Sequence, residues 1–198
     1  MRLPCDAALI VIDARRAFEA PGNNPGAETM IAELVAAWRA EALPVFHVRH
    51  DAGEPASPRL PDAPGAGFER EAAQRPGETV IERSADSAFA GTGLEEALDA
   101  IGATTLVVCG ALTGDAVEAT VRHGAGLGYR IFVVADACWA VDERDLAGRL
   151  RPAEEVHALS LAHMRGGYAE VVDGATALRA AGLANARRRA QAAVAGGS

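Results

Sequence analysis

The segment from Thr104 to Thr120 constrains the fold more than any other part of the sequence. It begins with an apolar run rich in β-branched residues, which is typical of a buried strand. The run breaks at Gly110, and we expect a helix to begin near Thr113 or Asp115, because both residue types cap helix N-termini. A strand that enters a helix through a tight turn presents backbone N–H groups at its carboxyl end, where ligands bind in open parallel sheets.

Strand-like and helix-like segments alternate along the chain. Short apolar runs predict further strands at residues 7–13, 44–50, 79–82, 130–136 and 168–173. Helical spacing predicts helices at residues 28–43, 94–101, 113–127 and 152–164, and from residue 175 onward. The alternation predicts an α/β protein of the three-layer αβα type, in which a doubly wound, mainly parallel, Rossmann-like sheet carries helices on both faces.

The length of 198 residues fits one domain with a full core. We expect residues 1–185 to form this domain and residues 186–198 to form the end of the last helix and a tail. Two segments do not fit the regular pattern. Residues 52–77 are rich in proline and glycine and are expected to form a lid or a partner-contact loop, and residues 141–150 are expected to be a charged surface segment.

Composition excludes several classes of function. The net charge is −8, and the basic run Arg187 to Arg189 is interpreted as a solvated helix face, so nucleic acid is not an expected partner. No apolar run reaches the ~18 residues of a membrane helix, and the N-terminus lacks the layout of a signal peptide, which favours a cytoplasmic protein. Cys5, Cys109 and Cys138 are too few and too widely spaced for a disulfide framework or a zinc site.

Neither metal nor cofactor is expected. His47 and His50 would point to opposite sides of one strand, which argues against a shared metal ion. The sequence also contains no glycine-rich phosphate-binding pattern. All 19 basic residues are arginine, so a mechanism that needs a lysine is closed to this chain.

Three candidate functional positions follow predicted strands. Asp13 ends the first strand, Arg83 follows a second, and the turn from Gly110 to Ala116 follows a third. In a parallel sheet these ends converge on one edge. A carboxylate can move a proton and helix-start N–H groups can hold an oxyanion, which suits hydrolysis, but the set lacks a nucleophile.

With these motifs the sequence resembles the isochorismatase-like hydrolase superfamily, which includes nicotinamidase, N-carbamoylsarcosine amidase and isochorismatase. The resemblance covers nearly everything from residue 7 to residue 173 and is strongest in the Ser-Ala-Phe and Gly-x-x-Thr blocks. The matching segments are residues 9–13, residues 47–51, residues 83–89 with Gly91, Thr92 and Leu94, residues 110–117 and residues 136–138.

The resemblance implies a role for each matched position. The family's acid/base aspartate falls on Asp13, its lysine on Arg83, and its nucleophilic cysteine on Ala116. It also implies a cis peptide bond between Ala111 and Leu112 that helps to aim N–H groups at the oxyanion. The chain therefore departs from the family pattern at two of its three catalytic positions, and a methyl group cannot act as a nucleophile.

Three interpretations remain open at this point. In the first, the protein is a hydrolase without a thiol, as isochorismatase is, with Asp13 as the acid on an enol ether. In the second, the fold has lost catalysis and binds a small molecule or a partner. In the third, Ala116 replaces a catalytic cysteine so that substrate is trapped. Cys109 and Cys138 do not rescue a thiol mechanism, since both are expected to be packed and inert.

The expected pocket surrounds these positions. The backbone from Leu112 to Ala116, Asp115 included, would cradle an oxyanion or ligand, and the pocket walls would include Phe18, His50, Phe89 and Trp139. The enzyme interpretation predicts that Asp13 is desolvated and that its pKa is raised. The expected partners are a small-molecule substrate and further copies of the chain, in a homodimer or homotetramer.

Overall fold

The computed structural model describes residues 3–14, 22–50 and 72–183, and these residues fold around one six-stranded parallel sheet. The strands run in the order β3-β2-β1-β4-β5-β8. Their bounds are Ala8–Ile12 for β1, Val45–His50 for β2, Thr79–Arg83 for β3, Thr105–Ala111 for β4, Arg130–Trp139 for β5 and Glu170–Val172 for β8. The order reverses direction between β1 and β4, and ligands bind at such a reversal, outside the carboxyl ends of the strands.

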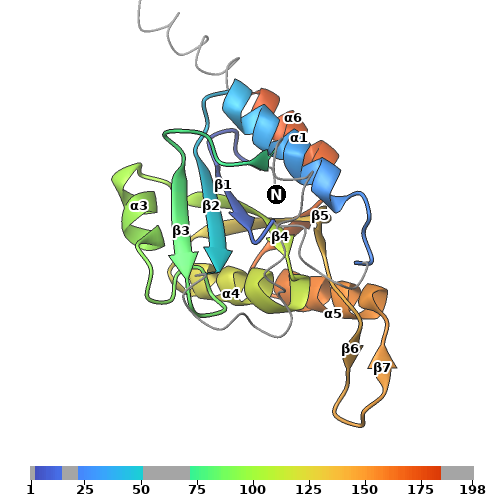
Figure 1. Cartoon of the computed structure of the whole chain (residues 1–198). Helices are drawn as coiled ribbons and strands as arrows, with labels where there is room; N and C mark the ends of the chain where they lie inside the picture. The colour runs from blue at the N-terminus through green and yellow to red at the C-terminus, as the bar shows by residue number, and fades with distance from the viewer. Residues whose placement is uncertain (1–2, 15–21, 51–71, 184–198) are drawn as a thin grey trace, which may run out of the picture.

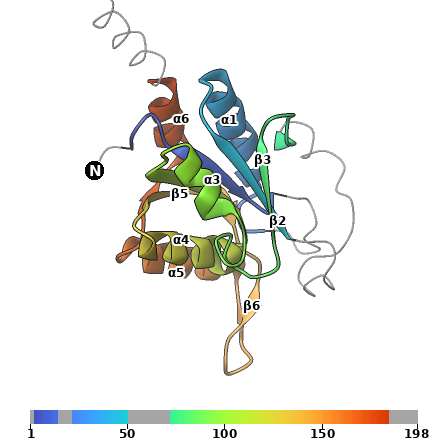
Figure 2. The same ribbon diagram turned by 90° about the vertical axis from the view of Figure 1, so that its left-hand side faces the viewer.

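Helices cover both faces of this sheet, which confirms the three-layer prediction. Figure 1 shows α1 beside α6 on one face and α4 with α5 on the other, and Figure 2 shows the same layers from the side. Their bounds are Ala27–Ala40 for α1, Leu94–Ala100 for α3, Glu118–Gly126 for α4, Ala153–Arg165 for α5 and Gly174–Gly182 for α6. Within the described ranges, no helix is both long enough and apolar enough to span a bilayer.

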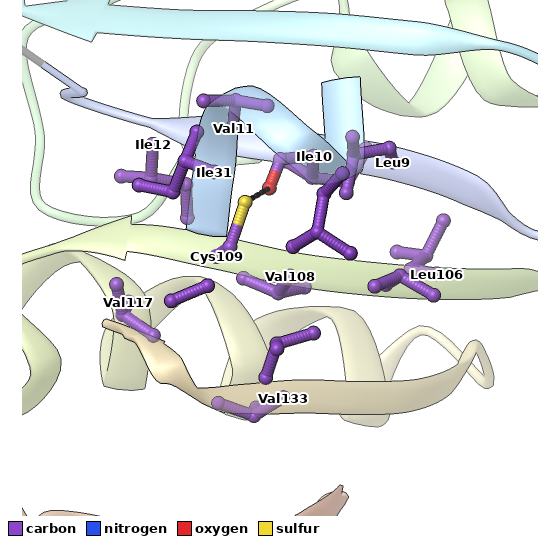
Figure 3. Close-up of a cluster of buried hydrophobic side chains, with 14 of the residues drawn as sticks. Leu9, Ile10, Val11, Ile12, Ile31, Leu106, Val108, Cys109, Val117 and Val133 are labelled. Carbon is purple, nitrogen blue, oxygen red and sulfur yellow. Dashed lines mark hydrogen bonds between the residues drawn. The ribbon is translucent and has the colours of Figure 1, made fainter. Parts of the chain in front are cut away.

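The central strands supply the core because they are apolar on both faces. Every residue of β1 and of β4 is buried, as expected for strands covered by helices on both sides. Figure 3 shows Ile10, Val108 and Val133 from three adjacent strands within one apolar cluster, with the Cys109 thiol directed at the Ile10 carbonyl oxygen at 3.8 Å.

Strand β5 is longer than the sequence indicated. We expected it to end at Asp136, but it continues to Trp139 through a shift of register against β4. The acid at this position does not face a ligand edge. The Asp136 carboxylate accepts a hydrogen bond of 2.7 Å from the backbone N–H of Gly174 at the start of α6, and its carbonyl oxygen accepts one of 2.9 Å from Asn24. Asp136 therefore connects β5 to the layer formed by α1 and α6.

A helical segment begins at Thr113, as expected, but its first turn is not α-helical. Thr113–Val117 forms a π-helical turn, η1, and the α-helix α4 begins at Glu118. Asp115 interrupts η1 with φ −126° and ψ −108°, which is not helical. Neither Thr113 nor Asp115 is the cap: the N-cap residue of η1 is Leu112, whose side chain cannot accept a hydrogen bond.

The charged segment 141–150 contains structure that the sequence analysis missed. It forms most of a small antiparallel hairpin of β6 (Glu143–Arg144) and β7 (Leu150–Arg151) that projects from the body of the protein in Figure 1. Asp145 organises the turn by accepting hydrogen bonds of 2.9 Å from two backbone N–H groups within it. The expectations for residues 52–71 and 184–198 concern parts of the chain outside the described residues.

Candidate functional site

The candidate site lies at the carboxyl edge of β1 and β4, where the strand order reverses. Gly110 makes the close approach of these strands possible. Its φ is +123°, and a Cβ atom there would lie 1.9 Å from the carbonyl oxygen of Ile12. Only glycine tolerates both this dihedral angle and this proximity. The pairing of Ile12 with Gly110 brings the residues that follow each strand, Asp13 and Ala111, to the same edge.

Asp13 turns sharply away from the direction of its strand. Its φ is +43°, in the left-handed region, and its backbone N–H donates to the Val48 carbonyl oxygen at 2.9 Å. The side chain is held at both oxygens: Oδ1 accepts a hydrogen bond of 3.1 Å from the backbone N–H of His50, and Oδ2 pairs with the guanidinium of Arg83. Three neighbouring strands, β1, β2 and β3, therefore fix the position of this carboxylate.

Arg83 reaches Asp13 from the end of β3, and the pair is buried. The two residues are 4% and 6% exposed, respectively. Nη2 of Arg83 donates to the carboxylate and Nη1 donates to the Ala85 carbonyl oxygen at 2.6 Å. The Nε–H group is buried and has no hydrogen-bond partner among the described residues. A buried N–H group without a partner is costly, so this arginine is not an ideal fit to its surroundings.

Burial determines the proton affinity of Asp13. Removal from water raises the pKa of this carboxyl above 3.8, although the adjacent Arg83 guanidinium and the His50 N–H oppose the effect. The direction agrees with the enzyme interpretation, which predicts a desolvated acid with a raised pKa. A carboxyl group whose pKa is moved towards neutrality is better suited to general acid catalysis.

The turn η1 follows β4 and carries Ala116. The Ala111–Leu112 peptide bond that precedes it is cis, as the resemblance implies. The backbone N–H groups of Asp115 and Val117 both donate to the Leu112 carbonyl oxygen, at 3.1 and 3.2 Å, so they are engaged within the turn. The Ala116 side chain is buried and carries no reactive group.

The remaining sequence-predicted residues lie in different places. Trp139 pairs with Ala111 across β5 and β4, which places it at the edge that carries the candidate site. His50 contributes its backbone N–H to Asp13. The Phe89 ring instead packs against the rings of His123 and Tyr129, with centroid distances of 5.6 and 5.5 Å, and so contributes to packing around α4. Phe18 lies outside the described residues.

A cavity of about 200 Å³ adjoins Asp13 in the described part of the chain. Its walls are largely apolar, with Val11 and Val80 among them, and its charged lining is already paired. His47 contacts the Glu78 carboxylate at 2.8 Å, and Arg49 contacts Glu82. Among the described residues that the sequence placed at the site, Asp13 alone lines this cavity, and the rest of its wall comes from Ala14, from β1, β2 and β3, and from residues 72–74.

The buried thiols do not supply the missing nucleophile. Burial, with a smaller contribution from the neighbouring Cys138, raises the pKa of Cys109 well above its usual value. Burial likewise raises the pKa of Cys138 to about 12, against an opposing hydrogen bond from the Gly110 backbone. Neither thiol forms a thiolate near neutral pH, which agrees with the expectation that both are inert. Within the described ranges, no three His, Cys, Asp or Glu side chains gather in a way that could hold a metal ion.

One residue beside η1 was not identified from the sequence. His157 on α5 contacts the Thr113 hydroxyl through its ring Nδ1 atom at 2.8 Å. The two residues are 44 positions apart, and a single histidine in a predicted helix carries no signal of such a contact.

Comparison with known proteins agrees with this fold. The family model described as the isochorismatase domain matches residues 7–176, which is most of the chain. The protein belongs to the isochorismatase family.

Individual relatives support the assignment. The isochorismatase family protein YrdC of Bacillus subtilis is 30% identical over 169 residues, which cover 83% of this chain and 90% of YrdC. A streptothricin hydrolase of Streptomyces noursei is 35% identical over 134 residues, which cover 66% of this chain and 48% of that protein. The crystal structure of an isochorismatase-family protein from Chromobacterium violaceum superposes with a TM-score of 0.83 at 45% identity, covering 92% of this chain and 97% of that one.

Proposed function

We propose that the protein is a hydrolase of a small metabolite that works without a protein thiol, with Asp13 as its general acid and base. The observation that carries the proposal is the buried Asp13 carboxyl, which three strands hold at the reversal of the sheet and whose pKa burial raises.

An enol ether is the substrate class that this set of groups fits best. Protonated Asp13 would give its proton to the vinyl carbon, and water would add to the resulting oxocarbenium carbon. The carboxylate would take a proton back from that water, and the hemiketal would collapse to a ketone and an alcohol. The sequence consumes one water molecule and regenerates Asp13, and no step requires a nucleophile at Ala116.

Other groups at the edge have supporting roles in this proposal. Arg83 keeps its charge at all relevant pH values, so we assign it to anchoring Asp13 rather than to proton transfer. The N–H of Ala116 lies between two amides that are engaged within η1, and we assign it to the alcohol oxygen that departs when the hemiketal collapses, which is where negative charge develops in this reaction. Trp139 and His50 would border the substrate.

A second candidate function is binding without turnover. The observation that favours it is the saturation of the ion pair: both Asp13 oxygens and both terminal nitrogens of Arg83 already have hydrogen-bond partners. Names of relatives, such as streptothricin hydrolase, N-carbamoylsarcosine amidase and nicotinamidase 3, suggest in addition that an amide or ureido C–N bond is the target. In that case Ala116 would mark a disabled or trapping form of a cysteine hydrolase.

One substrate panel separates these possibilities. Simple amides, ureido acids and isochorismate are incubated with the unchanged chain, with Ala116→Cys and with Asp13→Asn. Cleavage of isochorismate by the unchanged chain, with a rate that falls as the pH rises through the raised pKa of Asp13, supports the thiol-free hydrolase. The pH profile is measured on the unchanged chain, so it does not depend on the folding of Asp13→Asn.

The other outcomes are equally informative. Amide cleavage by Ala116→Cys alone would identify a disabled cysteine hydrolase and its substrate class. If neither form cleaves any compound while one of the compounds binds, as measured by calorimetry, the binding function replaces the proposal. We also expect a homodimer or homotetramer, and light scattering on the purified chain tests this oligomeric state directly. The expected location of the protein is the cytoplasm.

A further inference from the structure

The turn that carries Ala116 rests on helix α5, which the proposed reaction does not use. Thr113, the first residue of η1, is completely buried, and its hydroxyl lies 2.8 Å from Nδ1 of His157. The next residue of the turn, Gly114, meets α5 as well. A Cβ atom at Gly114 would lie 2.7 Å from Oγ of Ser160, so α5 packs directly against the backbone here.

One geometric contact joins the turn to the His157 ring. Nδ1 of His157 lies within hydrogen-bond distance of the Thr113 hydroxyl, which can donate to a bare ring nitrogen or accept from one that carries a proton. Burial lowers the pKa of His157 and so favours the neutral ring. In either tautomer of that ring, one hydrogen bond connects α5 to the first residue of η1.

We propose that His157 is a positioning residue that holds η1, and with it Ala116, in place through its hydrogen bond with the Thr113 hydroxyl. The contact joins α5 to the first residue of the turn, across 44 positions of sequence. Its consequence for catalysis rests on the proposed function, but the contact itself can be tested without any substrate.

Amide hydrogen exchange resolved by residue is the direct test. Asp115 and Val117 both donate to the Leu112 carbonyl oxygen, so their N–H groups report on the integrity of η1. In Thr113→Val and in His157→Leu we expect these two amides to exchange about five- to tenfold faster, which is the effect of losing one hydrogen bond. In the double variant these two amides should exchange little faster than in either single variant, because both substitutions remove the same contact.

Matched variants distinguish positioning from general support of the fold. In His157→Asn the side-chain amide supplies a hydrogen-bonding group in place of Nδ1, so exchange in the turn should return close to that of the unchanged chain. Leu159→Ala changes an exposed side chain on the same helix and should leave η1 unaffected. Faster exchange that is spread evenly over α5 and β5, or a Thr113→Val variant with an unchanged turn, would overturn the proposal.

A spectroscopic measurement decides the matter if His157→Leu fails to fold. The ¹⁵N shifts of the His157 ring in the unchanged chain should show a neutral ring, and Thr113→Val should shift the Nδ1 resonance. An Nδ1 resonance that Thr113→Val leaves unchanged would show that the hydroxyl does not bind the ring, and the proposal would be wrong. Because no substrate enters either measurement, failure of the hydrolase proposal leaves these results unaffected, and a negative result here leaves the hydrolase proposal standing.

Discussion

The buried pair of Asp13 and Arg83 gives the most demanding test of how the site is built. Removal of one partner from a buried ion pair costs about 3–5 kcal/mol, because the other charge stays buried without compensation. The two partners are not equivalent. A carboxylate left alone can neutralise itself by binding a proton, whereas a guanidinium, with a pKa above about 12, cannot. The two single substitutions should therefore depend differently on pH.

Asp13→Asn replaces the acid by a neutral group of the same shape, whose oxygen can still accept a hydrogen bond from the charged arginine. The raised pKa of Asp13 means that the folded protein disfavours the charged carboxylate. The unchanged chain therefore loses stability as the pH rises through this pKa and the variant does not, so the cost of Asp13→Asn should fall with rising pH and lie below the range of about 3–5 kcal/mol at about pH 8.

Arg83→Met leaves an acid whose pKa rises further. A folded-state pKa above the unfolded value gives stability that is present at low pH and is lost as the pH rises through the folded pKa. The loss in Arg83→Met should thus be smaller at about pH 5 than at about pH 8, by about 1.4 kcal/mol for each unit of pKa that is crossed.

Urea unfolding followed by tryptophan fluorescence measures these losses, since Trp38 and Trp139 are both buried. The matched control is Glu82→Gln, which breaks the exposed pair with Arg49 on the neighbouring strands and should cost less than about 1 kcal/mol. If the cost of Asp13→Asn rises with pH, or if the loss in Arg83→Met is independent of pH, the reasoning about a desolvated pair is wrong.

Three further predictions concern the scaffold. Burial raises the pKa of Glu78, but hydrogen bonds from Arg39 and other neighbours outweigh it and hold the value at about 2 instead of 4.5. Glu78→Gln should therefore cost about 3 kcal/mol of unfolding free energy at neutral pH. This difference from the unchanged chain should shrink as the pH falls from 4.5 towards 2, and a difference in urea unfolding that stays constant with pH would contradict the prediction. Gly110→Ala should lose at least about 2 kcal/mol of unfolding free energy, because its Cβ would meet the Ile12 carbonyl oxygen. The control Gly91→Ala, which is also at positive φ but has open space around it, should lose less in the same urea assay. The buried thiols should react with a chromogenic disulfide only after unfolding, and rapid reaction in the native protein would refute their assigned burial.

The sequence predicted those parts of the candidate site that lie at the ends of strands. Asp13 and Arg83 follow apolar runs, and parallel topology alone brings such ends to one edge. The sequence analysis was wrong where a side chain can take either of two roles that its residue type favours equally, such as capping a helix or binding a distant residue. Thr113 is a good helix cap in sequence, yet its hydroxyl binds His157, and helix α4 begins later. Nothing local indicates a partner 44 residues away.

The same limit applies to acids at strand ends. Asp136 follows an apolar run just as Asp13 does, but β5 continues past it and its carboxylate binds the start of α6. The hairpin of β6 and β7 escaped prediction because its strands have two residues each and no apolar face. Residue type and spacing thus define the edge of the sheet, while the choice between a reactive and a structural carboxylate depends on long-range contacts.

We propose that the two departures from the family pattern, Arg83 and Ala116, are physically connected, and this leads to a last prediction. A cysteine nucleophile must lose its proton to Asp13, but in this protein one carboxylate oxygen pairs with Arg83 and the other accepts from the His50 N–H. A planar guanidinium that also donates to the Ala85 carbonyl oxygen fixes the carboxylate firmly, which suits an acid that acts on water and substrate but hinders proton transfer from a thiol.

Restoring the thiol alone should therefore restore little activity. In the double variant Ala116→Cys with Arg83→Lys, the compact ammonium of lysine leaves more of the Asp13 carboxylate available. The replacement of Arg83 also removes its buried Nε–H group, which lacks a hydrogen-bond partner among the described residues. We expect kcat/KM for amide hydrolysis at least about tenfold higher in the double variant than in Ala116→Cys, which corresponds to about 1.4 kcal/mol of transition-state stabilisation. Arg83→Lys alone serves as the control and should hydrolyse no amide. Equal rates in the two thiol-bearing variants would show that Arg83 supports the thiol pathway as well as lysine does, and the proposed link between the two departures would be wrong.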